Sequence, residues 1–162
     1  MDEEVLYKGR VWSVVEKGQV EFLRLSSGIT VSTMVIGLDE RGRILMIEKE
    51  CLPVGGRALV LPGGKVEQGE EVKKATRREF EEETGYTVAN LKLFGQLYIF
   101  PGYLDGKTIC FVGDVGLRGE RGGDNLDKVS PRWLVRGSLA KMVQEGKLRD
   151  ARSAAFLGRY LL

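Results

Sequence analysis

Short runs of hydrophobic residues, separated by glycine, proline and charged residues, dominate the first part of the chain and predict β-strands. These runs cover residues 11–15, 20–25, 30–38, 43–47 and 59–61. The polar tetrapeptide at 39–42, Asp-Glu-Arg-Gly, lies between two of the runs and predicts a hairpin loop. Pro62, Gly63 and Gly64 end the last of these strands.

Between residues 70 and 84 the pattern changes to that of a helix. Helix-forming residues continue there without glycine or proline up to Gly85, which is typical of a C-terminal cap. The later elements are expected at 91–100 and 108–115 (strands), 116–127 (a polar, glycine-rich loop), and 138–145 and 149–162 (amphipathic helices). This order predicts an α/β fold in which helices pack on the faces of a sheet.

Length and charge narrow the class of protein. A chain of 162 residues suits a single domain over 1–162, and 43% hydrophobic residues can supply its core. A net charge of +2 creates no field that would predict binding to nucleic acid or to a membrane surface, and no apolar run is long enough to span a bilayer. The acidic start lacks the hydrophobic segment of a signal peptide, so we expect a cytoplasmic protein.

The chain contains no histidine. This excludes an imidazole base, a zinc site with histidine ligands, and nucleophiles that a histidine would activate. The two cysteines, Cys51 and Cys110, do not make a disulfide framework. The chemistry must therefore depend on carboxylates, lysine, arginine, tyrosine or a hard metal ion.

The predicted helix carries acidic residues on the side that should face the core. On a helical wheel, Glu79, Glu82 and Glu83 fall on the same side as Phe80, whereas 73, 74, 77 and 81 lie on the opposite face, which should be solvated. Clustered carboxylates repel one another, and Arg78 is expected to neutralise one of them but not all three. A hard divalent cation such as Mg²⁺ would neutralise the rest, since it prefers carboxylate and carbonyl oxygens. The alternative interpretation is a solvated helix with ordinary Glu–Lys pairs.

The segment that contains this helix resembles the Nudix box. The matching residues are Gly64, Glu70, Arg78, Glu79, Glu82, Glu83 and Gly85, at the spacing of that motif. Phe80 departs from the pattern, because the family usually has an aliphatic residue there. The resemblance implies a Nudix-type α/β/α sandwich around a mixed β-sheet, and hydrolysis of a nucleoside diphosphate that is linked to another group.

The resemblance also implies roles for individual residues. Glu79 and Glu83 would be ligands of Mg²⁺, with Mn²⁺ as a substitute, and the carbonyl of Gly63 would assist them. Glu82 would be a further ligand or would orient the attacking water. Glu70 and Arg78 would form a structural ion pair between the loop and the helix.

Further along the chain the similarity is to the ADP-ribose pyrophosphatase branch of the family. Pro101, Tyr103 and Asp105 match a segment that binds substrate there, and residues 1–28 resemble a β arm that builds a homodimer. Residues 49–51, Lys-Glu-Cys, stand where the branch commonly has Gln-Tyr-Arg, and Arg57 is the expected replacement for that arginine. Taken alone, Pro101 and Gly102 would also suit an ordinary turn.

The resemblance implies a general base on a loop after the last predicted strand. The loop at 118–127 offers Glu120, Asp124 and Asp127, of which Asp124 and Asp127 match the branch better. The favoured function is conversion of ADP-ribose to AMP and ribose 5-phosphate. The alternatives are hydrolysis of a nucleotide sugar, a nucleoside triphosphate, a dinucleoside polyphosphate or a capped RNA end, and a sensor that binds a nucleotide without hydrolysing it.

Overall fold

The computed structural model describes residues 2–119 and 129–162 and places them in two sheets and three α-helices. The N-terminal sheet comprises β1 (Glu3–Lys8), β2 (Trp12–Lys17) and β3 (Val20–Leu25). The main sheet comprises β4 (Val31–Leu38), β5 (Ile44–Cys51), β6 (Gly56–Val60), β7 (Tyr86–Tyr98), β8 (Lys107–Arg118) and β9 (Val129–Leu134). The helices are α1 (Val72–Thr84), α2 (Arg136–Gln144) and α3 (Ala151–Leu161), and a 3₁₀ turn covers Leu52–Val54.

The main sheet is mixed. Its strand order is β6-β5-β4-β8-β7, with β9 paired to β5. Strands β4 and β8 run parallel, with Val31 opposite Lys107, and the other pairs are antiparallel. A parallel pair needs a long crossover connection, which here contains both α1 and β7.

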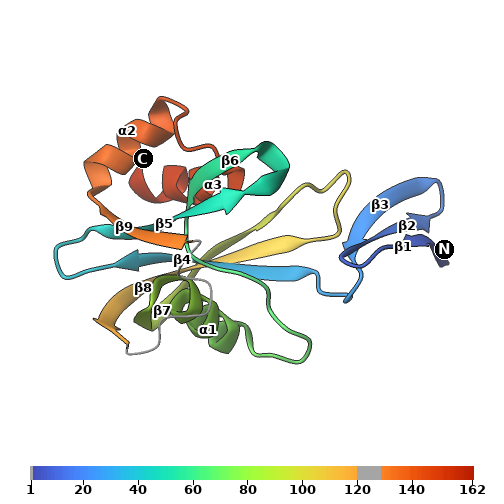
Figure 1. The fold of residues 1–162 in the computed structure, drawn as a ribbon, viewed down its shortest axis with the longest axis horizontal. Coiled ribbons are helices and arrows are strands. Elements are labelled where there is room, and N and C mark those ends of the chain that lie inside the picture. Colours follow the sequence, from blue (N-terminus) through green and yellow to red (C-terminus); the bar gives the residue numbers. More distant parts are fainter. Residues whose placement is uncertain (1, 120–128) are drawn as a thin grey trace.

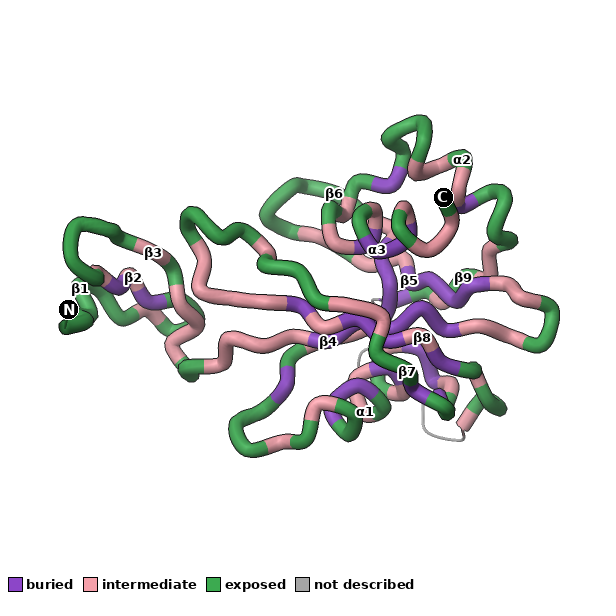
Figure 2. The backbone as a smooth tube through the Cα atoms, turned by 180° about the vertical axis from the view of Figure 1, so that it is seen from behind, coloured by how far each residue is buried: buried purple, intermediate pink, exposed green. Residues whose placement is uncertain are grey.

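The helices cover both faces of this sheet (Figure 1). On one face, Phe80 of α1 packs with Val35, Leu45 and Phe111. On the other face, residues of α2 and α3 pack against the central strands; this cluster includes Met34, Ile36, Met46, Leu139, Phe156 and Leu157. Figure 2 shows the buried residues concentrated in the central strands and in the helix faces that meet them. The predicted α/β/α sandwich with a mixed sheet and an N-terminal β arm is therefore confirmed.

Two strands were not predicted, and several predicted boundaries are wrong; β5, for example, continues to Cys51 instead of residue 47, and β6 begins at Gly56 instead of residue 59. Every residue of β1 is exposed, so the strand has no alternation of buried and solvated positions that a sequence could reveal. Strand β9 contains Pro131, which argues against a strand when only the sequence is read. Tyr86 pairs with Arg118, so β7 begins directly after α1, and residues 116–118 belong to β8 instead of a loop.

No described helix has the length and the apolar character that crossing a bilayer would require.

Candidate active site

Helix α1 is fixed to the main sheet by one apolar face. Ala75, Thr76 and Phe80 are fully buried. Gly85 ends the helix in the left-handed region, with φ of 73°, and its N–H donates to the carbonyl of Glu81, so the predicted cap is confirmed. Because Phe80 is buried in the core, its neighbour Glu79 is held at the edge of the packed face.

The three acidic side chains of α1 that the helical wheel singled out differ in exposure. Glu79 and Glu83 are 18% and 17% exposed, whereas Glu82 is 52% exposed. The wheel is therefore right for Glu79 and Glu83 and wrong for Glu82, whose side chain faces solvent. It is also wrong for Glu81, which is half-buried although the wheel placed it on the solvated face. A wheel gives only the angle around the helix, while exposure depends on which strands and loops surround it.

Arg78 binds three carboxylates at once. Its Nε and Nη2 donate to the two carboxylate oxygens of Glu70, at 3.0 and 2.9 Å. Its Nη1 donates to Glu79 at 3.0 Å and to Glu82 at 3.2 Å. Arg78 therefore pairs with two of the three helix carboxylates instead of the one expected, because Nη1 donates to both Glu79 and Glu82.

Glu83 has two partners outside the helix. The backbone N–H of Gly63 donates to its Oε2 at 2.8 Å, and Nζ of Lys49 donates to its Oε1 at 3.1 Å. Sequence reasoning missed Lys49, which lies 34 positions away from Glu83. The available signal was the tripeptide at 49–51, where an arginine was expected and a lysine stands two residues earlier.

The loop before α1 approaches the sheet and the helix so closely that side chains are excluded. A Cβ on Gly63, whose φ is 153°, would collide with the backbone carbonyl of Thr33. A Cβ on Gly64 would collide with the carboxylate of Glu79. The carbonyls of Pro62 and Gly64 accept hydrogen bonds from β4. Within the described residues, the carbonyl of Gly63 accepts none, and its oxygen is left for another ligand.

Glu79 and Glu70 both accept hydrogen bonds from Arg78, but their pKa values are shifted in opposite directions. Burial raises the pKa of Glu79 above the ordinary value, and repulsion from Glu82 and Glu83 adds to this effect, while Arg78 opposes it. The hydrogen bonds from Arg78 hold the pKa of Glu70 below the ordinary value. Glu70 is therefore a stable anion, whereas Glu79 is a carboxylate that gains from a cation.

The donor set suits a hard divalent ion. It combines three carboxylates with the Gly63 carbonyl, and these are the oxygens that Mg²⁺ takes. Across residues 2–119 and 129–162, however, no three acidic, histidine or cysteine side chains lie close enough together to hold a metal ion. The carboxylates are paired with Arg78 and Lys49 instead. A metal ion would have to displace these cations.

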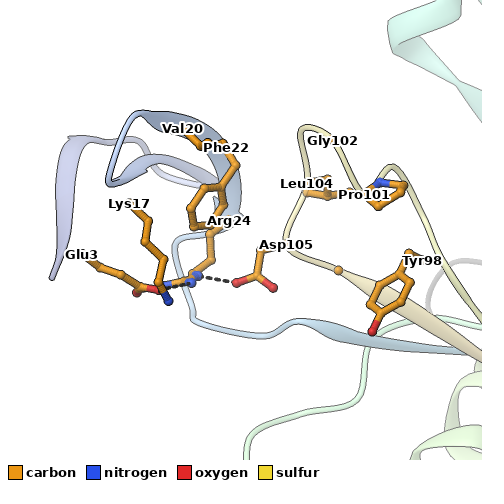
Figure 3. Close-up of a pocket in the computed structure, with 11 residues that line it drawn as sticks. Glu3, Lys17, Val20, Phe22, Arg24, Tyr98, Pro101, Gly102, Leu104 and Asp105 are labelled. Carbon is orange, nitrogen blue, oxygen red and sulfur yellow. Dashed lines mark hydrogen bonds and ion pairs between the residues drawn. The ribbon is translucent and has the colours of Figure 1, made fainter. Parts of the chain in front are cut away.

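The candidate substrate residues of the later segment lie beside the N-terminal arm. Pro101 and Asp105 line a cavity of about 430 Å³ between the arm and the β7–β8 connection, together with Phe22 and Arg24 of β3 (Figure 3). Asp105 is bound to the arm, since Arg24 Nε donates to its carboxylate at 2.7 Å. Tyr103 is exposed and stacks on Phe100, with ring centroids 4.9 Å apart.

The remaining candidates are Arg57 and the acidic residues of the loop at 118–127. Arg57 donates to the backbone carbonyl of Glu48 at 3.1 Å and pairs with the Glu48 carboxylate at 3.7 Å, and no helix carboxylate is among its partners in the described part of the chain. Lys49 is instead the cation next to Glu83. Glu120, Asp124 and Asp127 lie outside the described residues.

Fold and site together define an α/β/α protein whose acidic helix packs on one face of a mixed sheet, with the glycine loop hydrogen-bonded to the central strand β4. The NUDIX domain matches residues 28–147 of this chain. The chain therefore belongs to the Nudix family.

Individual relatives support this assignment. The chain is 30% identical to an ADP-ribose pyrophosphatase of Bacillus subtilis over 122 residues, which cover 74% of this chain and 66% of that protein. It is 32% identical to a putative 8-oxo-dGTP diphosphatase of the same organism over 121 residues, which cover 75% of this chain and 76% of that protein. A crystal structure of an ADP compounds hydrolase shares the fold, with a TM-score of 0.80 and 18% identity over 97% of this chain and 88% of that chain.

Proposed function

We propose that this protein hydrolyses the diphosphate bond of a nucleoside diphosphate derivative with Mg²⁺, and that ADP-ribose is converted to AMP and ribose 5-phosphate. The observation that carries the proposal is the pair Glu79 and Glu83, both less than one fifth exposed, beside the Gly63 carbonyl, which accepts no hydrogen bond from the described residues. A diphosphate cannot be attacked until its negative charge is neutralised, and carboxylates held at the edge of a core provide the ligands for that ion.

In this proposal each residue has one task. Glu79, Glu83 and the Gly63 carbonyl hold the metal ion, and Glu82 is a further ligand or orients the attacking water. When bound, the ion neutralises the phosphate charge and acidifies a bound water. Glu70 and Arg78 keep the loop and α1 in register through their bidentate ion pair. Asp124 or Asp127, or else Glu120, accepts the proton of the attacking water as one phosphorus–oxygen bond of the diphosphate breaks.

The nucleoside end of the substrate is proposed to lie towards the arm. Pro101 and Asp105 border a cavity there, and the exposed rings of Tyr103 and Phe100 offer a surface on which a base can stack. The arm also exposes apolar side chains, among them Val5, Tyr7, Val20 and Trp12. We propose that a second copy of the chain covers them in a homodimer.

A second candidate substrate class is supported by the similarity to the putative 8-oxo-dGTP diphosphatase. A nucleoside triphosphate would use the same carboxylates, since both substrate classes present a phosphoanhydride to the metal ion. The two classes differ in the group attached to the far end of the phosphate chain and not in the chemistry at α1.

The proposal is tested by incubating the protein with an equimolar mixture of ADP-ribose, a nucleotide sugar, a dinucleoside polyphosphate and the common nucleoside triphosphates. Products are identified by mass spectrometry, with Mg²⁺ and with EDTA. Loss of ADP-ribose to AMP with Mg²⁺ only is the expected result. Loss of another component would retain the site and replace the substrate. No turnover, combined with a thermal shift on adding ADP-ribose, would show a sensor.

A further inference from the structure

A second cavity, of about 750 Å³, is lined in part by Lys49, the residue that pairs with Glu83 of α1. It is bordered by the β5–β6 hairpin, from Lys49 to Ala58, and by the residues that begin α3. These two segments are joined in the structure, because the hydroxyl of Ser153 accepts a hydrogen bond from the backbone N–H of Leu61. Figure 1 shows β6 and α3 side by side. Of the residues that line it, Arg57 alone was among the substrate residues predicted from the sequence, and the functions discussed above give the cavity itself no ligand.

Positive charge predominates in its lining. The charged residues that line it are Lys49, Arg57, Arg149 and Arg152, against Glu50 and Asp150. Asp150 is committed to α3, since its Oδ1 accepts hydrogen bonds from the backbone N–H and the hydroxyl of Ser153, at 2.8 and 2.7 Å. It caps the helix and contributes less to neutralising the cavity than its charge suggests.

The arginines of the cavity have donors to spare. Arg152 lies 3.5 Å from the Asp150 carboxylate and Arg57 lies 3.7 Å from that of Glu48, both longer than a good charge-assisted hydrogen bond. One further donor of Arg57 is used by the backbone carbonyl of Glu48, at 3.1 Å. Arg149 is exposed, and among the described residues no carboxylate pairs with it. A guanidinium presents five N–H donors in a fork that matches a phosphate, so unused arginine donors in a cavity favour a phosphate as the ligand.

Lys49 connects this cavity to the candidate metal ligands. It lines the cavity, and its Nζ lies 3.1 Å from Oε1 of Glu83. A substrate whose diphosphate lies at Glu83 would therefore have the cavity directly beyond it. The arm cavity is near the Lys65 end of the glycine loop, since Lys65 pairs with Ser32 and lines a small pocket together with Asp105, which also lines the arm cavity.

We propose that the cavity binds a phosphate carried by the part of the substrate that lies beyond the diphosphate, away from the nucleoside. This inference rests on the proposed function, and it deepens that function by naming a substrate class: diphosphate-linked nucleosides whose second half ends in a phosphomonoester. Arg149 and Arg152 bind this terminal phosphate, and Arg57 contributes a third donor. Lys49 lies between the diphosphate and the terminal phosphate. When its ammonium group leaves Glu83, it contacts the phosphate chain.

The test uses two substrates that differ by one phosphate, ADP-ribose and ADP-ribose 1″-phosphate. For the wild-type protein, kcat/KM should be about tenfold or more higher for the phosphorylated compound, since two charge-assisted contacts are added. The double variant Arg149→Gln/Arg152→Gln should lose this preference while its kcat/KM for ADP-ribose stays within about twofold of the wild type. The single variant Arg149→Gln, at an exposed position, serves if the double variant does not fold.

The control removes the same charge elsewhere in the C-terminal part of the chain, at Lys141 of α2 and at Lys147 after that helix. Lys141→Gln/Lys147→Gln deletes two exposed cations that pair with Glu145 and do not line the cavity. The preference for the phosphorylated substrate should survive in this variant. If both double variants lost this preference equally, net charge would explain it and the phosphate site would be overturned. A wild-type protein that shows no preference for the phosphorylated substrate would also overturn the site.

A separate measurement distinguishes failure of this inference from failure of the proposed function. If neither compound is hydrolysed, the proposal that ADP-ribose is the substrate fails, and the cavity is tested by calorimetry with ribose 1,5-bisphosphate. The wild type should then bind this compound about tenfold more tightly than Arg149→Gln/Arg152→Gln. Equal affinities would overturn the phosphate site.

Discussion

The acidic end of α1 and the N-terminal arm are attached to the main sheet in different ways. Helix α1 is held by fully buried side chains such as Phe80, and the loop before it makes backbone hydrogen bonds to β4. The arm is joined to the β7–β8 connection by the Arg24–Asp105 ion pair and by two backbone hydrogen bonds of Leu23. Helix α1 is therefore held by packing in the core, whereas the arm is held by polar contacts that water can reach.

This difference matches the tasks that we propose for the two regions. Carboxylates that hold a metal ion must keep their geometry to within a fraction of an ångström, and a packed core provides that rigidity. Binding of the nucleoside end of the substrate tolerates more movement of the arm, because the binding energy there is spread over a larger surface. Changes near α1 should therefore affect kcat, and changes near the arm should affect KM.

The largest effect is expected for Glu83→Gln. The variant keeps an oxygen that can accept from the N–H of Gly63, so the fold should be retained, but it loses the charge that attracts a metal ion. We expect kcat to fall by about 10²–10³-fold, equivalent to several kcal/mol of transition-state stabilisation. Steady-state kinetics with Mg²⁺ and a thermal melt measure the two quantities. Glu81→Gln on the same helix is the control and should keep most of the activity; full activity in Glu83→Gln would refute the assignment of Glu83.

Gly64→Ala should have the next largest effect. The added Cβ would meet the carboxylate of Glu79, which can move because it is the end of a side chain. A displaced ligand should lower kcat by about 10- to 100-fold, as misplacements of about 1 Å do. Gly63→Ala is the informative comparison, since its Cβ would meet the backbone of β4. It should lower the melting temperature as well as kcat, and equal melting temperatures for the two variants would contradict this account of the loop.

Asp105→Asn should change binding more than turnover. The neutral amide cannot form the ion pair with Arg24. Both side chains of this pair are about one third exposed, and without it the arm should detach from the β7–β8 connection more often. We expect KM to rise about two- to fivefold with kcat unchanged. Hydrogen exchange over residues 3–25 should become faster in the variant. Asp114→Asn in β8, away from the arm, is the matched control, and a fall in kcat without faster exchange would rule out this role for Asp105.

The smallest effect concerns the pH dependence of the Glu70–Arg78 pair. The pKa of Glu70 is lower in the folded protein than the ordinary value of 4.5, so the unfolded chain binds more protons in that range. The contribution of the pair to stability is therefore complete above pH 4.5 and is lost as the pH falls through the lowered pKa. Glu70→Gln should melt about 1–2 °C below the wild type at pH 7, and the two proteins should converge in acid. A constant difference from neutral pH down into strong acid would contradict the assigned pKa shift.

Local patterns made much of this protein predictable. The glycine loop, α1 and its cap at Gly85 depend on residues of one continuous segment, and their spacing alone places Glu79 and Glu83 beside Phe80. Short hydrophobic runs predicted β4 and β5, whose consecutive buried residues lie in the centre of the sheet. The Nudix family was indicated by the same segment and is confirmed. Conversely, β1 escaped prediction because none of its residues is buried.

The partners of the site residues were decided only by the tertiary structure. Lys49 meets Glu83 across 34 positions, Arg24 meets Asp105 across 81, and the Leu61 amide meets Ser153 across 92. Such contacts depend on strand register and on the crossover between β4 and β8, neither of which is encoded in a local pattern. The sequence by itself therefore determined which chemical groups the protein has and which helix carries them. The fold decided which cations neutralise those groups, because burial and long-range pairing exist only once the sheet is assembled.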